Sequence, residues 1–387
     1  LRTEKGFAIT GVKAYLNEDK KENASLALLG ELDALRIPEH AFANPETNAA
    51  HCCGHHAQMA GVFGAALALT VPEIAEKLDG QVVFFATPAE EYGEIEFKNQ
   101  LREQGKIRYG GGKCELLRIG AFDDIDLCLT HHIRPGNEIL VGSGTGNGFV
   151  SKVIRVLGKA SHAAGAPEKG VNALSAASLG LQALGLNRET FRDEDCVRVH
   201  PIITKGGNLV NVIPDEVVVE TLVRGKTIEA FTDAAKKTDR SFKAGAIAMG
   251  AKVEISTLPG YLPTLAEEAL PELKHAAEIS ASGIPVIEAS GHAGGSTDVG
   301  DVQHLMPVYT FNTGGVKGGL HQIDFEVTDE EEAYIVTAKM FALAAYGLLK
   351  EKAQRSRELV DQYEPVFKNS AEYVEFMEQF DSKEIFE

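Results

Sequence analysis

Short runs of consecutive apolar residues constrain the fold of this chain more than any other feature. The clearest are Gln81–Thr87, Ile125–Thr130 and Met306–Asn312, and Ser25–Gly30 is a shorter example. Strands that are apolar on both faces are typical of parallel sheets covered by helices on both sides. Between the runs, apolar residues follow helical spacing, as they do over Ala57–Leu69. The alternation predicts an α/β fold with a mostly parallel sheet.

The middle of the chain has a different order of elements. The patterns predict strands over 149–157, 197–204, 217–223 and 252–257, and helices over 171–184 and 228–249. This β-α-β-β-α-β order is that of the ferredoxin-like split βαβ unit. We therefore expect an inserted domain at 150–258, within a discontinuous outer domain formed by 1–149 and 259–387.

The two ends of the sequence give less information. Thr328-Asp329-Glu330-Glu331 resembles a capping box and predicts a helix that continues to about Leu349. Residues 351–387 are charged and are expected to be helical. The first residues, Leu1-Arg2-Thr3-Glu4, do not form a signal peptide and lack an initiator Met, so we expect the natural start to be missing.

Composition excludes several classes of protein. With 44% hydrophobic and 24% charged residues, the chain of 387 residues is expected to fold rather than to be disordered. Its formal net charge of −18 disfavours nucleic acids and anionic membrane surfaces as partners. No run approaches the roughly 20 apolar residues that span a bilayer. Five cysteines, an odd and sparse set, indicate a reducing cytoplasm rather than a disulfide framework.

The segment His51-Cys52-Cys53-Gly54-His55-His56 is the densest group of possible metal ligands. Thiolate and imidazole are common ligands of zinc and related ions. A Cys-x-His pair cannot share one helix face, but it can converge on a metal from a turn, which Gly54 would permit. Alone, the segment is more simply explained as two buried cysteines and surface histidines.

Three further features stand at the ends of predicted strands. They are the carboxylate pair Glu90-Glu91, the pair His131-His132, and His321. Each has an ordinary explanation by itself, as a solvated charge pair or a buried histidine. Ligands bind at the carboxyl ends of parallel strands, so their joint layout predicts a metal site. Two adjacent carboxylates would suit one metal ligand and one proton shuttle.

The inserted domain offers a second set of polar residues. His162 follows its first predicted strand, and Asn211 precedes a strand that ends at Arg224. Together they could bind an anionic ligand that carries a carbonyl group, since Arg pairs bidentately with carboxylates. Each of the three also has a purely structural explanation.

Taken together, these segments resemble peptidase family M20, and within it the N-acyl-amino-acid and aminobenzoyl-glutamate hydrolases. The matching segments occur in the family's order along nearly the whole chain and are Glu31-Leu32-Asp33-Ala34-Leu35, Ala50 to His55, Pro88 to Glu91, His132 to Gly136, Gly158 to Ala163, Asn211 to Asp215 with Arg224, Gly295 to Gly300, and Leu320-His321. Each motif is weak alone, and the set is specific.

The resemblance implies a metal-binding catalytic domain and a smaller lid domain that dimerises. It implies two divalent metal ions, zinc or manganese, and the ligands would be Cys53, His55, Glu91, His132 and His321. Glu90 would be the general acid/base. His162, Asn211 and Arg224 would come from the lid, with His162 reaching the active site of a partner chain. The substrate would be a small amide, and the protein a homodimer or higher homo-oligomer.

The chain departs from the family in three places. His56 stands where the family has Asp or Asn. The pair His131-His132 leaves the ligand ambiguous by one residue, although the family's His-Val/Ile-x-Pro pattern favours His132. The family also has a helix and a strand before the segment that matches Ser25–Leu35, and little precedes it here.

Three other interpretations remain open at this stage. The same residues could form a dipeptidase or aminopeptidase-like peptidase. They could also bind metal without catalysis, although the presence of Glu90 disfavours a silent site. Finally, Cys53 and His55 could act as a cysteine hydrolase, but they lie too close in sequence to orient freely against each other.

Overall fold

The computed structural model describes residues 1–387, which group into two compact units. The first unit comprises residues 1–145, 264–292 and 298–373. The second comprises residues 146–263, 293–297 and 374–387. Each unit is described by itself.

The first unit contains an eight-stranded sheet in the order β1-β2-β6-β3-β7-β17-β8-β15. Its four central strands are β6 (Gln81–Thr87), β3 (Ser25–Glu31), β7 (Leu127–Ile133) and β17 (Val308–Thr313). These four run parallel to one another. The prediction of a mostly parallel sheet is thereby confirmed. The outer strands are β1 (Arg2–Phe7), β2 (Gly11–Leu16), β8 (Ile139–Val141) and β15 (Val286–Glu288).

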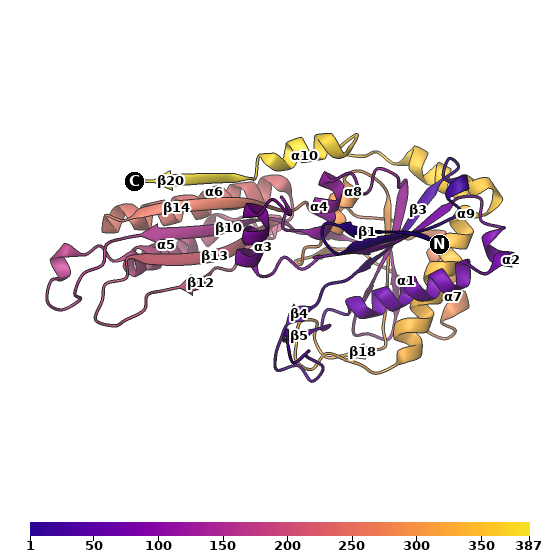
Figure 1. Ribbon diagram of the computed structural model, residues 1–387, viewed down its shortest axis with the longest axis horizontal. Coiled ribbons are helices and arrows are strands. Elements are labelled where there is room, and N and C mark those ends of the chain that lie inside the picture. Colours follow the sequence, from indigo (N-terminus) through magenta and orange to yellow (C-terminus); the bar gives the residue numbers. More distant parts are fainter. The chain divides into compact units, whose positions relative to one another are not determined.

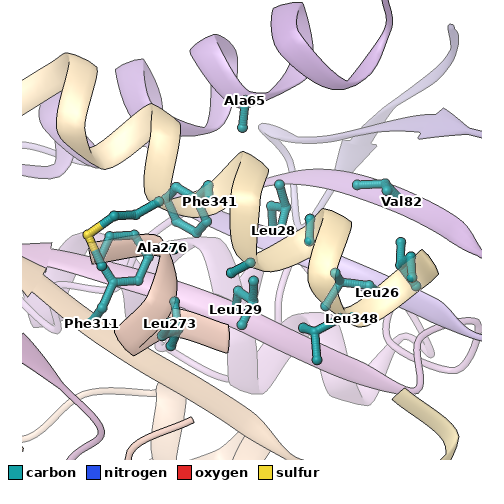
Figure 2. Close-up of a cluster of buried hydrophobic side chains, with 14 of the residues drawn as sticks. Leu26, Leu28, Ala65, Val82, Leu129, Leu273, Ala276, Phe311, Phe341 and Leu348 are labelled. Carbon is teal, nitrogen blue, oxygen red and sulfur yellow. The ribbon is translucent and has the colours of Figure 1, made fainter. Parts of the chain in front are cut away.

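Helices cover this sheet because its central strands are apolar on both faces. Leu26 and Leu28 of β3 are fully buried in the cluster drawn in Figure 2, which also contains side chains of α1 (His55–Leu69), α7 (Pro271–Ser280) and α9 (Thr337–Gln362). The alternate residues Ala27 and Leu29 are equally buried and point to the opposite face. Each large apolar side chain buried in this way contributes roughly 1.5–3 kcal/mol.

The remaining elements of the first unit are short. They are β4 (Leu35–Arg36), β5 (Ala49–Ala50), α2 (Pro72–Ala75), α3 (Ile95–Glu103), α4 (Gly112–Arg118), α8 (Val299–Gln303), β18 (Val316–Lys317) and β19 (Glu326–Val327). Three of them, β5, α3 and α4, lie in the connections that carry the candidate site.

The long C-terminal helix differs from its prediction. It begins with a π-helical turn, Glu331–Val336, and continues as α9. The residue that caps it is Asp329, whose carboxylate accepts a hydrogen bond from the backbone N–H of Glu332 at 3.1 Å. The predicted capping box at Thr328 is therefore wrong by one residue. The predicted end near Leu349 is confirmed, because residues 350–353 have non-helical backbone angles and separate the last part of α9 from the first.

By length and composition, residues 331–362 could cross a membrane, and half of the apolar window is buried within the molecule. Met340, Phe341 and Leu348 are fully buried against the sheet and α1. A core helix has this composition because one of its faces packs on the protein interior.

The second unit has an antiparallel sheet in the order β11-β13-β10-β14-β20, with β12 also paired to β13. Its long strands are β10 (Gly148–Leu157), β13 (Glu216–Gly225) and β14 (Lys252–Tyr261). Helices α5 (Ala173–Asn187) and α6 (Ile228–Met249) lie along one face of these strands (Figure 1). The role of this unit as a lid stays a prediction.

Two predictions for this unit are corrected. The expected strand over 197–204 is divided into β11 (Arg198–Val199) and β12 (Ile202–Lys205), because Pro201 between them has no N–H to donate to the ladder. The tail is not helical throughout. After α10 (Ser370–Glu378) it forms β20 (Ser382–Phe386), which pairs antiparallel with the edge of β14.

Candidate metal centre

The carboxyl ends of the central strands carry most of the predicted donor side chains. Glu90 and Glu91 follow β6, and His132 lies near the end of β7, while Glu31, which was not predicted as a donor, ends β3. His321 comes from the segment after β17. Cys53 and His55 join them from the start of α1, which follows β5. The strands are parallel, so their ends meet at one edge of the sheet and bring these residues together.

The donor atoms form three overlapping groups, each with its atoms within 4.8 Å of one another. The groups are Cys53, His55 and His132; Cys53, Glu91 and His321; and Glu31, His55 and Glu90. Cys53 belongs to two of the groups, and His55 also belongs to two. All five predicted metal ligands and the predicted acid/base Glu90 therefore lie in one cluster.

The spacing of the donor atoms suits bound divalent ions better than it suits direct hydrogen bonds among the donors. The Cys53 Sγ atom lies 3.5 Å from His132 Nε2 and 3.2 Å from His321 Nε2. His55 Nε2 and Glu91 Oε1 are buried and face other possible ligands, since Glu31 Oε2 lies 3.2 Å from the first and His321 Nε2 lies 2.9 Å from the second. One thiol, imidazoles and carboxylates around a shared sulfur suit two closely spaced ions of the zinc type.

The backbone around Cys53 is shaped to present these donors. Gly54 precedes α1 with a φ of 87°, and a Cβ at this position would come within 2.1 Å of the Ile133 side chain. Only glycine fits such a turn. His321 also has a positive φ, 63°, and its N–H donates to the carbonyl of Cys52 at 2.9 Å. This hydrogen bond between main-chain atoms joins the segments that carry Cys53 and His321.

Behind the donors lies a buried network of charges that is centred on Lys113. Its Nζ lies 2.6 Å from Glu31 Oε1 and 2.6 Å from Asp298 Oδ1, and all three side chains are nearly inaccessible to solvent. Burial raises the pKa of Glu31, but the ammonium of Lys113 outweighs it and lowers the pKa overall. An ionised Glu31 then faces His55, with Glu31 Oε2 3.2 Å from His55 Nε2.

The adjacent carboxyl groups Glu90 and Glu91 differ in environment. Burial, together with the charges of Glu31 and Asp298, raises the pKa of Glu90 well above its ordinary value. Burial also acts on Glu91, but the His321 ring, 2.9 Å from Glu91 Oε1, lowers the pKa of that carboxyl. One group is thus disposed to hold a proton and the other to stay ionised, which are the two roles a proton shuttle and a ligand require.

The structure also distinguishes the neighbouring histidines. His131 is buried in the core, where its Nε2 lies 2.8 Å from Thr313 Oγ1 and its ring packs on Phe311. His132 points to the other face of β7 and joins the donor cluster. His56 belongs to none of the three donor groups, and its ring packs on Phe325 and Tyr334.

The three polar residues predicted in the second unit do not converge. His162 and Asn211 are exposed and lie on adjacent segments, where the Ala163 N–H donates to the Asn211 carbonyl at 3.0 Å. Arg224 donates to Ser296 Oγ at 2.7 Å.

The strand register shows how far apart these residues are. Arg224 pairs with Phe149 at the end of β10 where the chain enters the unit, whereas His162 follows the opposite end, at Leu157. Phe149 and Leu157 are eight residue steps apart, which is roughly 27 Å at about 3.4 Å per step. The expectation that all three residues of one chain could share a small ligand is therefore wrong.

Sequence reasoning assigned no role to four charged residues that the structure places around the donors. They are Glu31, Asp33, Lys113 and Asp298. Three of them lie in segments that carried the family resemblance, so a signal existed for these. Lys113 had no such signal, because a lysine within Gly111-Gly112-Lys113 reads as a surface residue.

Comparison with known proteins gives a consistent result. The profile of "Peptidase family M20/M25/M40" matches residues 27–346. A mouse protein named Xaa-Arg dipeptidase is 28% identical over 311 residues, which cover 78% of this chain and 64% of that protein. The N-acetyl-L-cysteine deacetylase of Bacillus subtilis is 25% identical over 371 residues, covering 92% of this chain and 82% of that protein. The match thus spans less than two thirds of the mouse relative's length.

Among solved structures, a Bacillus subtilis protein described as a dinuclear metal binding peptidase of the M20 family has a similar fold. The TM-score is 0.58 with 24% identity, and the match covers 88% of this chain and 85% of that one.

Proposed function

Since the chain belongs to peptidase family M20/M25/M40, we propose that it is a metal-dependent amidohydrolase. It would cleave the amide bond of an N-acyl amino acid or a small dipeptide-like substrate. The observation that carries this proposal is the thiol of Cys53, shared by two donor groups, with Glu90 in the adjoining third group. The relatives named as a dipeptidase and a deacetylase act on bonds of this kind.

Five residues would hold two divalent ions, zinc or manganese. They are Cys53, His55, Glu91, His132 and His321. Such ions, when bound, polarise a carbonyl group and lower the pKa of water from about 15.7 to about 7. All five cysteines are free, which supports a reducing, cytoplasmic location in which the Cys53 thiol stays available.

Glu90 would move the proton. Its carboxylate accepts a proton from the attacking water as the water oxygen bonds to the amide carbon. The same proton then passes to the amine nitrogen as the C–N bond breaks, leaving a carboxylic acid and a free amine. The raised pKa of Glu90 suits this role, because a shuttle works best with a pKa near the working pH. Such proton transfer contributes typically about 10²–10⁴ in rate.

The second unit would supply the remaining contacts. His162 would donate to the developing oxyanion, an effect of roughly 3 kcal/mol. Arg224 and Asn211 would bind the substrate carboxylate. Because Arg224 and His162 lie at opposite ends of β10 and β13, one small substrate cannot reach both within one chain. We therefore propose that His162 and Asn211 act in the site of a partner chain, in a homodimer.

The β12 side of the second unit's sheet is an edge at which such a dimer could form. β20 already covers the free side of β14. On the other side, Ile202, Ile203 and Val210 in and beyond β12 are exposed apolar residues. An uncovered edge strand with exposed apolar side chains is a ready site for pairing with another chain. A second copy joined there would pair the two sheets edge to edge.

A dipeptidase remains the alternative, and the name of the mouse relative favours it. The two functions share all the residues above and differ in the substrate pocket. A panel of N-acyl amino acids and dipeptides, assayed with one preparation, separates them. Higher kcat/KM on dipeptides would select the alternative.

Metal content tests the proposal as a whole. Protein purified without chelator should contain two divalent ions per chain by mass spectrometry, and exhaustive chelation should abolish hydrolysis. Restoring the metal should restore activity. Well under one ion per chain in folded protein would contradict the proposal. His56→Asn serves as a control, because His56 lies outside the donor groups and its substitution should leave the metal stoichiometry unchanged.

A further inference from the structure

A cavity of about 400 Å³ lies in the first unit, and none of the donor residues lines it. Val308 and Tyr309, at the amino end of β17, form part of its wall. The donors gather at the carboxyl ends of the parallel strands, so this cavity lies at the opposite end of β17. The rest of its wall comes from the segment before α7 and from the end of α9. A volume of this size is typical of small-molecule sites.

The charged residues that line this cavity are Glu267, Glu268 and Arg355. The charge of Arg355 is already compensated, because its Nε lies 3.0 Å from Glu272 Oε1 and its Nη1 lies 3.6 Å from Glu358 Oε2. Neither Glu267 nor Glu268 forms an ion pair. The charge that the wall leaves without a partner is therefore negative.

The carboxyl group of Glu267 receives hydrogen bonds from Thr310 alone. Its Oε1 accepts from the Thr310 N–H at 2.9 Å, and its Oε2 accepts from the Thr310 hydroxyl at 3.4 Å. Burial raises the pKa of Glu267 well above its ordinary value, and the two hydrogen bonds from Thr310 offset this only in part. Ionisation of this carboxyl is therefore costly unless a cation comes to lie beside it.

Two tyrosines line the same cavity, Tyr309 and Tyr363. Burial and the carboxyl of Glu267 raise the pKa of Tyr309 to about 12. Burial, together with Tyr309 and Glu267, raises the pKa of Tyr363 to about 12 as well. Both phenol groups thus stay neutral, and both lie close enough to Glu267 to sense its charge. The faces of such rings attract organic cations.

We propose that this cavity binds an organic ammonium ion, that is, a protonated primary amine on an apolar stem. The ammonium group donates to the carboxylate of Glu267, and the rings of Tyr309 and Tyr363 lie beside it. A hydrogen bond between two charged groups is among the strongest in proteins. The stem contacts the apolar part of the wall, which is formed by Leu265, Leu270, Pro271, Pro307, Val308 and Leu359.

Other classes of ligand fit this cavity less well. An anion is repelled by Glu267 and Glu268, which have no cation to compensate them. Calcium and magnesium require several oxygen ligands around one ion, and a single buried carboxylate does not supply them. A neutral molecule of the same size fills the space but leaves Glu267 without a partner. The proposal goes beyond hydrolysis and does not depend on it.

Calorimetric titration of the metal-loaded protein with n-pentylammonium tests the proposal. The neutral comparison is 1-pentanol, which has the same stem. At about pH 8 a primary alkylamine is protonated, as the side chain of lysine is. We expect n-pentylammonium to bind more than about tenfold more tightly than 1-pentanol, because hydrogen bonds to charged groups are stronger than those between neutral groups.

Two matched variants make this result specific to the cavity. Glu267→Gln keeps the shape of the side chain but removes its charge, so the affinity for n-pentylammonium should fall at least about tenfold. Its affinity for 1-pentanol should stay unchanged, which would show that the cavity is intact. Glu278→Gln is the control, because Glu278 is 70% exposed on α7 and does not line the cavity. This variant should bind both ligands as the wild type does.

Removal of the metal distinguishes this cavity from the donor cluster. Folded protein treated with chelator should bind n-pentylammonium as tightly as the metal-loaded protein, since the cavity lies at the opposite end of β17. Loss of binding after chelation would assign the amine to the metal centre and overturn the proposal. Equal affinities for the two ligands, equal effects of the two variants, or no binding of n-pentylammonium would overturn it as well.

Discussion

The two units of this protein carry their candidate functional residues in opposite ways. In the first unit, donors from four strand ends and one helix start converge within one cluster. In the second, His162 and Arg224 lie at opposite ends of the same sheet, and Arg224 is bonded to Ser296. The donors of a metal centre can thus come from one chain. In the second unit, by contrast, His162 and Arg224 of one chain cannot together complete a site.

The largest expected effect concerns the two adjacent carboxylates of the first unit. Glu90→Gln keeps the shape of the side chain but removes the proton acceptor, so kcat should fall about 10³-fold while both metal ions remain. Glu91→Gln should instead lower metal occupancy, because an amide is a weaker ligand than a carboxylate. Measuring kcat and metal content for both variants distinguishes the proton shuttle from the metal ligand. Near-normal turnover in Glu90→Gln would mean that the two roles are reversed.

The fold of the first unit could be predicted because its signals are local. Each apolar strand run is read from its own residues, and parallel pairing follows from the helices between the runs. β20 could not be predicted in the same way. Ser382–Phe386 is mostly polar and becomes a strand only by pairing with β14, about 130 residues earlier in the chain. Similarly, Pro201 interrupts a strand that the pattern alone extends.

The same distinction holds for the site. The donors could be predicted because parallel strand ends meet at one edge, and the alternation of β7 separates His132 from the core residue His131. Lys113 could not be predicted, since its partners Glu31 and Asp298 are 82 and 185 residues away. The distance between Arg224 and His162 could not be predicted either, because it depends on the register between β10 and β13.

A second prediction compares one buried lysine from each unit, Lys113 and Lys152. Lys113→Met leaves two buried carboxylates without their cation and should cost about 3–5 kcal/mol in the free energy of unfolding. Lys152→Met is the matched change in the second unit. Lys152 is as buried, but its partner Asp239 is 25% exposed and can be solvated, so the cost should be roughly 1–2 kcal/mol. Denaturant unfolding of both variants measures the difference, and equal costs would refute the explanation.

The third prediction tests whether the second unit completes the site of another copy. His162→Ala should reduce kcat about 10²-fold. Mixed with Glu90→Gln under conditions where subunits exchange, it should recover up to about a quarter of wild-type activity, because one site of each mixed dimer keeps both groups. Arg224→Ala, mixed in the same way, should show no recovery, since Arg224 lies where its own chain enters the unit and would serve its own site.

The His162→Ala mixture and the Arg224→Ala mixture serve as controls for each other. Subunit exchange is verified by mass, with one variant carrying a tag. Recovery with both variants would place Arg224 in the partner's site as well. Exchange without recovery in the His162→Ala mixture would show that His162 acts within its own chain, and the shared site would be excluded.

The smallest effect separates burial from charge compensation within the first unit. Glu267 is half-buried as a residue and accepts a hydrogen bond from the Thr310 N–H at 2.9 Å, and the burial of its carboxyl group raises its pKa well above the ordinary value. Glu31 is fully buried, yet its pKa is lowered, because it has Lys113 beside it. A carboxyl whose pKa is raised in the folded state contributes stability below its unfolded pKa, near 4.3, and loses that contribution as the pH rises through the folded value.

Glu267→Gln stays neutral and can still accept the Thr310 hydrogen bond. It should therefore match the wild type near pH 5 and exceed it at pH 8.5 by about 2 °C in Tm. Thermal unfolding at both pH values measures this, and an equal shift at the two would show that Glu267 is not held neutral by burial.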